Sequence, residues 1–179
     1  MTLTLGTLTL EPVEDDLLAA PVAAALAGVP SVAAQAHTVA IDPGLAETAA
    51  LTERYALDAD MSANCVIVLG KRGGELRPAA CVILSSTRAD VNGLVRRTID
   101  TRKCSFAPQD WAVAETGMEY GGITPVGVPE GWPILVDSAV TEQPWVLLGS
   151  GLRRSKLALP GASLAELPGA QVLEGLGLR

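Results

Sequence analysis

Hydrophobic residues fall along the chain in short runs separated by turn residues, a pattern typical of β-strands. The clearest case is a pair of β-branched runs at 64–70 and 79–85, separated by a glycine-containing turn at 71–75. Two such runs joined by a turn predict a β-hairpin. Alternating Thr and Leu at 2–10 predict a short exposed strand or an ordered arm. Further apolar runs predict short strands or apolar segments at 38–41, 103–106, 133–136, 145–149, 156–159 and 170–173.

Helical spacing of apolar residues appears in fewer places. Residues 90–100 form the clearest amphipathic helix, with Val91 and Val95 on one face and Arg96 and Arg97 on the other. An Ala-rich segment predicts a helix that Pro21 either kinks or restarts as a new first turn. Other helical segments are expected at 17–27, 45–55 and 108–116, with a helical turn at 163–167.

Many short strands with few regular helix crossovers predict an α+β fold. We expect a curved, mostly antiparallel sheet or barrel flanked by helices. Hydrophobic residues make up 49% of the 179 residues, enough to bury the core of one domain. We assign residues 36–179 to that domain and residues 1–35 to an N-terminal extension packed on it.

Composition narrows the classes of protein that the chain can represent. No apolar run is long enough to cross a membrane, and the first residues lack the basic region of a signal peptide, so we expect a cytoplasmic protein. Cys65, Cys81 and Cys104 are widely spaced, and His37 is the only histidine. These residues suggest neither a disulfide framework nor a metal site, and we expect no metal and no cofactor.

The formal net charge is −7, but the positive charges are clustered. One cluster contains Arg96, Arg97, Arg102 and Lys103, and the other contains Arg153, Arg154 and Lys156. An acidic protein can still bind nucleic acid when its basic residues share a face. The alternative is that both clusters are solvated edges of helices or loops.

A glycine-rich stretch at 116–127 is the most unusual segment, with four glycines and Pro125. Glycine allows a ligand or another backbone to come close, and successive amides held in such a loop can bind an anion or an oxyanion. The candidate donors are the amides of Gly121, Gly122 and Ile123. The alternative is a tight connection between a helix and a strand. The sequence offers no Ser-His-Asp set, so we expect no side chain of the loop to act as a nucleophile.

The order of these segments resembles the YbaK/EbsC family, which includes the editing domain of bacterial prolyl-tRNA synthetases. The resemblance covers roughly residues 36–175. Residues 121–127, Gly-Gly-Ile-Thr-Pro-Val-Gly, resemble the GXXXP loop of the family. Ser150 and Gly151, followed by Arg153 and Arg154, resemble its late serine-glycine turn with a basic residue.

The resemblance implies a hydrolase that removes wrongly attached amino acids from tRNA without a cofactor. Loop amides would stabilise the oxyanion, and the acceptor end of an aminoacyl-tRNA would be the partner. An aminoacyl-tRNA synthetase is a second candidate partner. The residues that the resemblance assigns to substrate binding are Thr124, Pro125, Ser150, Gly151, Arg153 and Arg154.

One position departs from the family pattern. Asn64 stands where family members that edit usually carry a lysine. Asparagine has no charge, but it can orient a water molecule or hold a ribose, so Asn64 remains a candidate catalytic residue. The departure leaves open a binding module of the same fold that is weakly active or inactive. An esterase or amidase acting on other acyl compounds is a third possibility.

Overall fold

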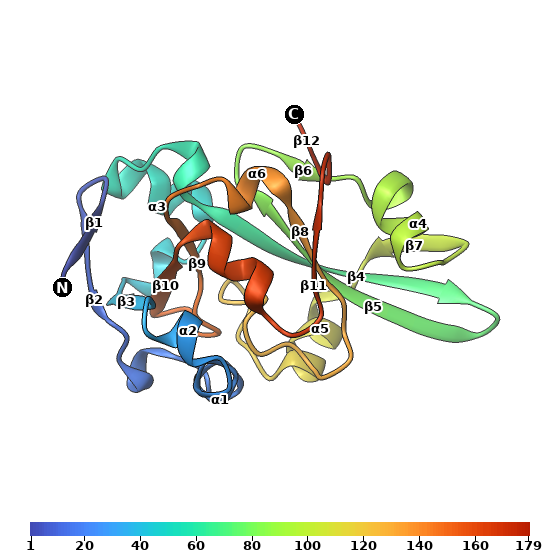
Figure 1. The fold of residues 1–179 in the computed structure, drawn as a ribbon, viewed down its shortest axis with the longest axis horizontal. Helices are drawn as coiled ribbons and strands as arrows, with labels where there is room; N and C mark the ends of the chain where they lie inside the picture. Colours follow the sequence, from blue (N-terminus) through green and yellow to red (C-terminus); the bar gives the residue numbers. More distant parts are fainter.

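The computed structural model describes all residues 1–179 and has the predicted α+β fold (Figure 1). Its strands are β1 (Leu3–Leu5), β2 (Leu8–Pro12), β3 (His37–Ala40), β4 (Ala63–Arg72), β5 (Glu75–Leu84), β6 (Arg88–Ala89), β7 (Lys103–Phe106), β8 (Ile134–Asp137), β9 (Val146–Gly149), β10 (Ser155–Leu159), β11 (Ala170–Leu173) and β12 (Gly177–Leu178). Its α-helices are α1 (Ala20–Ala27), α2 (Pro30–Ala33), α3 (Thr48–Tyr55), α4 (Arg96–Thr98), α5 (Gln109–Thr116) and α6 (Ser138–Thr141). None of these helices is long and apolar enough to cross a membrane.

Most strands belong to two five-stranded sheets. The first has the order β1-β2-β3-β10-β9, and all its pairs are antiparallel. The second has the order β11-β8-β5-β4-β7, in which only β8 makes parallel pairs. A parallel bridge between Ser62 and Leu147 joins the start of β4 to β9 and so connects the two sheets. Side chains from both sheets and from α1 and α2 form the largest hydrophobic cluster.

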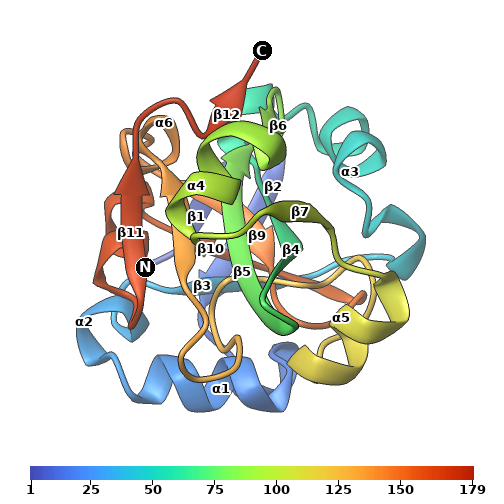
Figure 2. The same cartoon turned by 90° about the vertical axis from the view of Figure 1, so that its right-hand side faces the viewer.

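The predicted hairpin is confirmed as β4–β5, and its register runs from Ala63 opposite Leu84 to Arg72 opposite Glu75. Its turn is shorter than expected, because β4 ends at Arg72 and β5 begins at Glu75. Only Gly73 and Gly74 form the turn, and both have positive φ angles. The hairpin extends away from the first sheet, so that its turn and β1 lie at opposite ends of the molecule (Figure 1). Seen toward the hairpin turn, β11 and β7 flank it on either side (Figure 2).

The N-terminal residues are built into the core. β1 and β2 form a hairpin that joins the first sheet through the pairing of β2 with β3. Pro21 does not kink a longer helix; it stands in the first turn of α1, which begins at Ala20, so the second alternative is confirmed. Leu10 and Val22 are fully buried. Residues 1–35 therefore contribute two strands to the first sheet, and two helices whose side chains join its hydrophobic core.

Other predicted helices form with altered boundaries. The segment 90–100 begins at Asp90, whose carboxylate accepts the amides of Gly93 and Leu94, and a π-helical stretch (Val91–Val95) then leads into α4. Asp42 caps a short 3₁₀ turn (Pro43–Leu45), and α3 begins only at Thr48 rather than at residue 45. The sequence pattern did not predict α6, or the small sheet formed by β6 and β12.

Candidate active site

A pocket of about 330 Å³ lies where the two sheets meet. It is formed by the start of β4, the facing ends of β9 and β10, the first turns of α3 and part of the glycine-rich loop. Its wall is mostly apolar, with Asn64, Lys156, Glu47 and Ser62 among its polar residues. The lining residues are Ala46, Glu47, Thr48, Leu51, Ser62, Ala63, Asn64, Cys65, Val66, Tyr120, Gly121, Ile123, Leu147, Leu148, Gly149 and Lys156.

Lys156 is the polar residue that stands out in this pocket. It belongs to β10, whose five residues are all buried, and only 6% of its surface is exposed. Its ammonium group donates one hydrogen bond, to the carbonyl of Ala46 at 2.7 Å. An ammonium group has three N–H donors. Lys156 therefore brings a positive charge, with donor capacity to spare, to the wall of an apolar pocket.

Burial, and to a smaller extent the nearby Arg153 guanidinium, together lower the pKa of Lys156 from its ordinary value of 10.5 to about 8. Both effects act against the charged form. At neutral pH most molecules still carry the proton, because a pKa of about 8 lies above 7. Lys156 is therefore a destabilised cation, which a negative charge arriving in the pocket would stabilise.

Asn64 lies in the same pocket, at the second position of β4. Its Oδ1 accepts a hydrogen bond of 2.7 Å from the hydroxyl of Thr48 at the start of α3. This bond fixes the side-chain amide and leaves its NH₂ group without a protein partner. Asn64 can thus donate hydrogen bonds to a ligand in the pocket.

Ser62 provides a second unused polar group. It is 3% exposed, lines the pocket, and its hydroxyl has no hydrogen-bond partner in the protein. Buried hydroxyl groups are normally paired, so the Ser62 hydroxyl is free to bond to a polar group that enters the pocket. Ser62 and Lys156 therefore both point to a polar occupant.

The glycine-rich loop contributes Gly121 and Ile123 to the pocket. The N–H groups of these two residues make no hydrogen bond within the protein. Gly122 is different, because its N–H donates to the carbonyl of Glu119 at 2.9 Å and it does not line the pocket. Of the three amides expected as donors, two are thus available for a ligand.

Close packing explains why the loop needs glycine. A Cβ atom added at Gly122 would lie 2.7–2.8 Å from backbone atoms of Leu152, which is too close for any real contact. Gly121 instead adopts a φ of +79°, a backbone conformation that residues other than glycine rarely adopt. The loop therefore lies directly against the turn after β9, and this contact sets the position of its amides.

Several residues expected to bind substrate lie outside the pocket. Thr124 is fully buried, and Pro125 lines a separate groove. Ser150 is also fully buried, and its hydroxyl is bonded within the 150–155 turn. Gly151 has a φ of +85°, and its N–H donates to the carbonyl of Gly122. In the structure Ser150 and Gly151 shape the turn that supports the glycine-rich loop.

Arg153 and Arg154 hold neighbouring segments together. The Arg153 guanidinium donates to the carbonyls of Tyr120 and Pro43 and lies 5.8 Å from the centre of the Tyr120 ring. Arg154 donates to the carbonyl of Asp16 in the N-terminal segment. The Arg153 charge also acts on Lys156, because it disfavours a second positive charge nearby.

Sequence reasoning missed the pocket roles of Lys156, Ser62 and Glu47. Lys156 was noticed only as part of a basic cluster. A charged residue inside an otherwise apolar strand segment, Ser-Lys-Leu-Ala-Leu, is the feature that could have identified it. The three cysteines do not form a reactive centre, because burial raises the pKa of each thiol. No group of His, Cys, Asp and Glu side chains is placed to hold a metal ion.

The sequence profile of the aminoacyl-tRNA editing domain matches residues 42–167. This segment is more than half of the chain and contains every residue that lines the pocket.

Solved structures share the fold at low sequence identity. One is a protein proposed to be a trans-editing enzyme for prolyl tRNA synthetase; it is 20% identical, with a TM-score of 0.72, and the match covers 87% of this chain and 94% of the other. A hypothetical protein gives 20% identity and a TM-score of 0.73 over 85% of this chain and 97% of its own. A proposed signal transduction protein from Marinobacter aquaeolei VT8 is 14% identical, with a TM-score of 0.58; the match covers 89% of this chain but 30% of the other.

Proposed function

Because this chain belongs to the aminoacyl-tRNA editing domain family, we propose that it is a deacylase that hydrolyses the ester of wrongly charged aminoacyl-tRNA. It acts in trans on tRNA charged elsewhere, as its structural relative is proposed to do. The observation that carries the proposal is the convergence of Lys156, Asn64 and the amides of Gly121 and Ile123 on one pocket.

Lys156 answers the main argument against activity. Asn64 removes the positive charge from the position on β4 where the family usually has it. Lys156 brings a positive charge to the same pocket from β10. The charge is thus retained, while its attachment point has moved to another strand.

The chemistry of ester hydrolysis suits these groups. Water adds to the ester carbonyl and loses a proton to solvent, which gives a tetrahedral intermediate that carries an oxyanion. The intermediate then collapses, the bond to the ribose oxygen breaks, and that oxygen takes up a proton and leaves as the free hydroxyl of the tRNA. The Lys156 ammonium and the Gly121 and Ile123 amides donate hydrogen bonds to that oxyanion. Each donor is worth about 3–4 kcal/mol of transition-state stabilisation in a site that excludes water. The Asn64 NH₂ group orients the attacking water or the terminal ribose.

The remaining lining residues suit an amino acid. An aminoacyl ester carries a positive α-ammonium group, and Glu47 is the only acidic residue that lines the pocket. Glu47 therefore binds the α-ammonium group. The Ala, Leu, Val and Ile side chains in the pocket wall favour an apolar amino-acid side chain, and we propose that the shape of the pocket limits its size.

The test is a deacylation assay on a panel of aminoacyl-tRNAs with the wild type, Lys156→Met and Lys156→Arg. Methionine keeps the length of the side chain and removes the charge, whereas arginine keeps the charge. We expect hydrolysis of at least one substrate with a small side chain, and a loss of about a hundredfold or more in Lys156→Met. Partial activity in Lys156→Arg would show that the charge is what matters.

A binding module without catalysis is the second candidate, and the uncharged Asn64 is the observation that favours it. It predicts affinity for uncharged tRNA or for a non-hydrolysable aminoacyl analogue, with no loss of the acyl group from any substrate in the panel. That result would overturn the proposal that the protein is a deacylase.

A further inference from the structure

A second surface feature lies near the far end of the β4–β5 hairpin from the pocket. It is a groove of about 800 Å³ between the edge strand β7 and the start of the π-helical stretch. Four basic residues line it, and no acidic residue does. They are Lys71, Arg96, Arg102 and Lys103. In a chain with a net charge of −7, this is a local concentration of positive charge.

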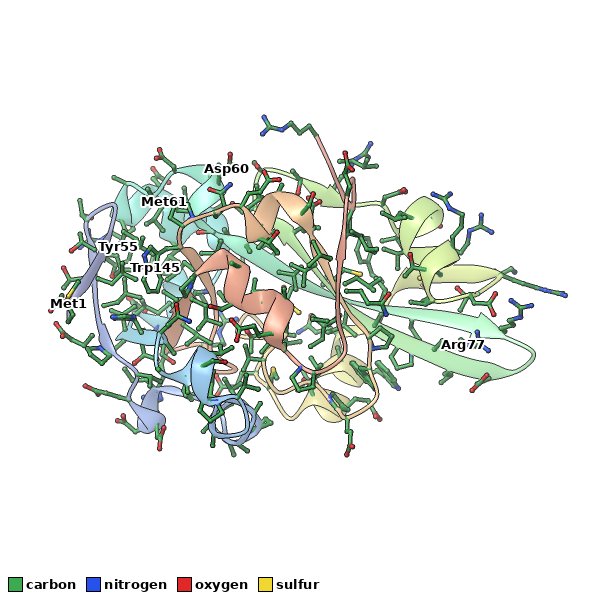
Figure 3. All side chains as sticks on the ribbon, viewed as in Figure 1. Met1, Tyr55, Asp60, Met61, Arg77 and Trp145 are labelled. Carbon is green, nitrogen blue, oxygen red and sulfur yellow. The ribbon has the colours of Figure 1, made fainter.

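These four side chains are not neutralised within the protein. None of them takes part in an ion pair. Nearby acids are already occupied, since Asp100 pairs with Arg72 and Arg77, and Glu75 pairs with Arg77. Arg77 lies at the hairpin end of the molecule, opposite Tyr55, Met61 and Trp145 (Figure 3). Arg96 is held in place by a bond from its Nε to the carbonyl of Asn92.

Two of the basic residues face each other directly. Lys71 of β4 is the cross-strand partner of Lys103 of β7, and both are exposed. Like charges at directly opposed positions destabilise a sheet. An anion bound by both ammonium groups would relieve that repulsion.

The groove also has an exposed aromatic side chain. Phe106, at the end of β7, lines it and is 59% exposed. A positively charged groove that follows the nucleic-acid backbone, combined with an aromatic surface for a base, is the arrangement that binds single-stranded nucleic acid.

We propose that this groove binds the sugar-phosphate backbone of the aminoacyl-tRNA near its acceptor end, with phosphate at Lys71 and Lys103 and a base or ribose against Phe106. The inference rests on the proposed function, because the acyl end would then occupy the pocket. The two features are connected by β4. Seven residues separate Asn64 from Lys71, or about 23 Å of extended strand. That distance is spanned by a few nucleotides of single-stranded RNA.

The experiment measures the binding of labelled, uncharged tRNA over a range of salt concentrations. It compares the wild type, the double variant Lys71→Ala/Lys103→Ala, and Phe106→Ala. The control is Arg88→Ala/Arg179→Ala, which removes the same charge from residues that do not line the groove. Hydrolysis of aminoacyl-tRNA and of a short aminoacyl ester of adenosine is followed on the same proteins.

We expect the lysine double variant to bind tRNA about tenfold or more weakly at about 50 mM salt, with a salt slope lower by about 1.5–2. Phe106→Ala should also bind more weakly, while the control should resemble the wild type. Hydrolysis of aminoacyl-tRNA should slow in the lysine variant, and hydrolysis of the short ester should not. The fold should survive, because the substitutions remove a repulsion.

If the lysine double variant binds tRNA with the same affinity and salt slope as the control, the proposal that the groove binds tRNA is overturned. A wild-type protein that does not bind tRNA at low salt would also overturn it. Failure of the proposed function has a different outcome. In that case neither ester is hydrolysed, yet tRNA binding still depends on Lys71 and Lys103, and the groove stands.

Discussion

At the scale of single residues, the buried Lys156 ammonium group lowers the stability of the fold and places a positive charge in the pocket. An ammonium group 6% exposed with one hydrogen bond is a costly feature in an apolar pocket. Such a residue is expected where catalysis needs it, because sites tuned for chemistry are often strained or poorly solvated. A structural lysine would instead be paired with a carboxylate, and Lys156 has no such partner.

The first prediction is that Lys156→Met makes the protein more stable and less active at pH 7. Below pH 8 the lysine is protonated in both the folded and the unfolded state, so burial of the charge has its full cost. Between pH 8 and 10.5 the folded state loses its proton first, and the cost disappears as the pH rises. The stability advantage of the variant should therefore shrink by about 3 kcal/mol over this range.

Denaturant unfolding of both proteins at pH 7 and pH 10.5 measures this difference. The buried cysteines act in the opposite direction, because burial raises their thiol pKa, that of Cys81 to about 12, so stability falls as pH rises above 9. They are present in both proteins and cancel in the comparison. A variant less stable than the wild type at pH 7 would show that the bond to Ala46 is the role of Lys156.

The second prediction concerns the position of the charge. If the pocket needs one cation and either strand can supply it, Asn64→Lys/Lys156→Met should recover part of the activity lost in Lys156→Met. Asn64→Lys alone places two ammonium groups in one pocket and should gain nothing. Single-turnover hydrolysis measures all three. No recovery in the double variant would mean that the direction of approach from β10 is essential.

Sequence reasoning found part of the pocket. Asn64, Gly121 and Ile123 were identified from the resemblance and from loop composition, and all three line it. Lys156 was missed because β10 is buried on both faces, so no alternation shows which way a side chain points. The direction of each loop amide depends on contacts with Leu152 and Glu119, which are set by tertiary structure.

At the scale of elements, the glycine-rich loop and the turn after β9 form one unit. Gly122 and Gly151 are joined by a backbone hydrogen bond of 2.7 Å. The N–H of Glu119 in turn donates to the carbonyl of Gly151. The amides of Gly121 and Ile123 are thus held by a second loop rather than by their own sequence.

The third prediction is that Gly122→Ala lowers both stability and activity. The new methyl group would meet the Leu152 backbone, and such overpacking typically costs about 1–3 kcal/mol. Gly28→Ala is the control, because its φ is negative and its nearest contact is at 3.3 Å. Thermal unfolding and deacylation of both variants test this. Wild-type stability in Gly122→Ala would show that the two loops separate easily.

Elements defined by local contacts were predicted well, and those defined by distant ones were not. The β4–β5 hairpin and the helical segment that follows Asp90 depend on neighbours in sequence. The pairing of β3 with β10 joins segments more than a hundred residues apart, and only the folded chain reveals it. The β6–β12 pair consists of two short strands without a repeating pattern.

At the scale of the whole molecule, the N-terminal residues support the pocket although the family profile starts at residue 42. β2 pairs with β3, which pairs with β10, the strand that carries Lys156. The hydroxyl of Ser155, next to Lys156, donates to the carbonyl of Leu17. The amide of Ala19 donates to the carbonyl of Ser150.

The last prediction is that residues 36–179 do not fold stably alone, although the sequence suggested a domain with this boundary. Deleting residues 1–35 exposes the edge of β3. It also uncovers the largest hydrophobic cluster, because Leu18, Val22, Leu26 and Val32 belong to it. We expect a fragment that aggregates or unfolds without a cooperative transition, and that has lost deacylation. A chain lacking only residues 1–4 is the control and should unfold cooperatively, because it keeps β2 and α1. A fragment 36–179 with a sharp thermal transition and normal hydrolysis would show that the N-terminal residues merely cover a complete domain.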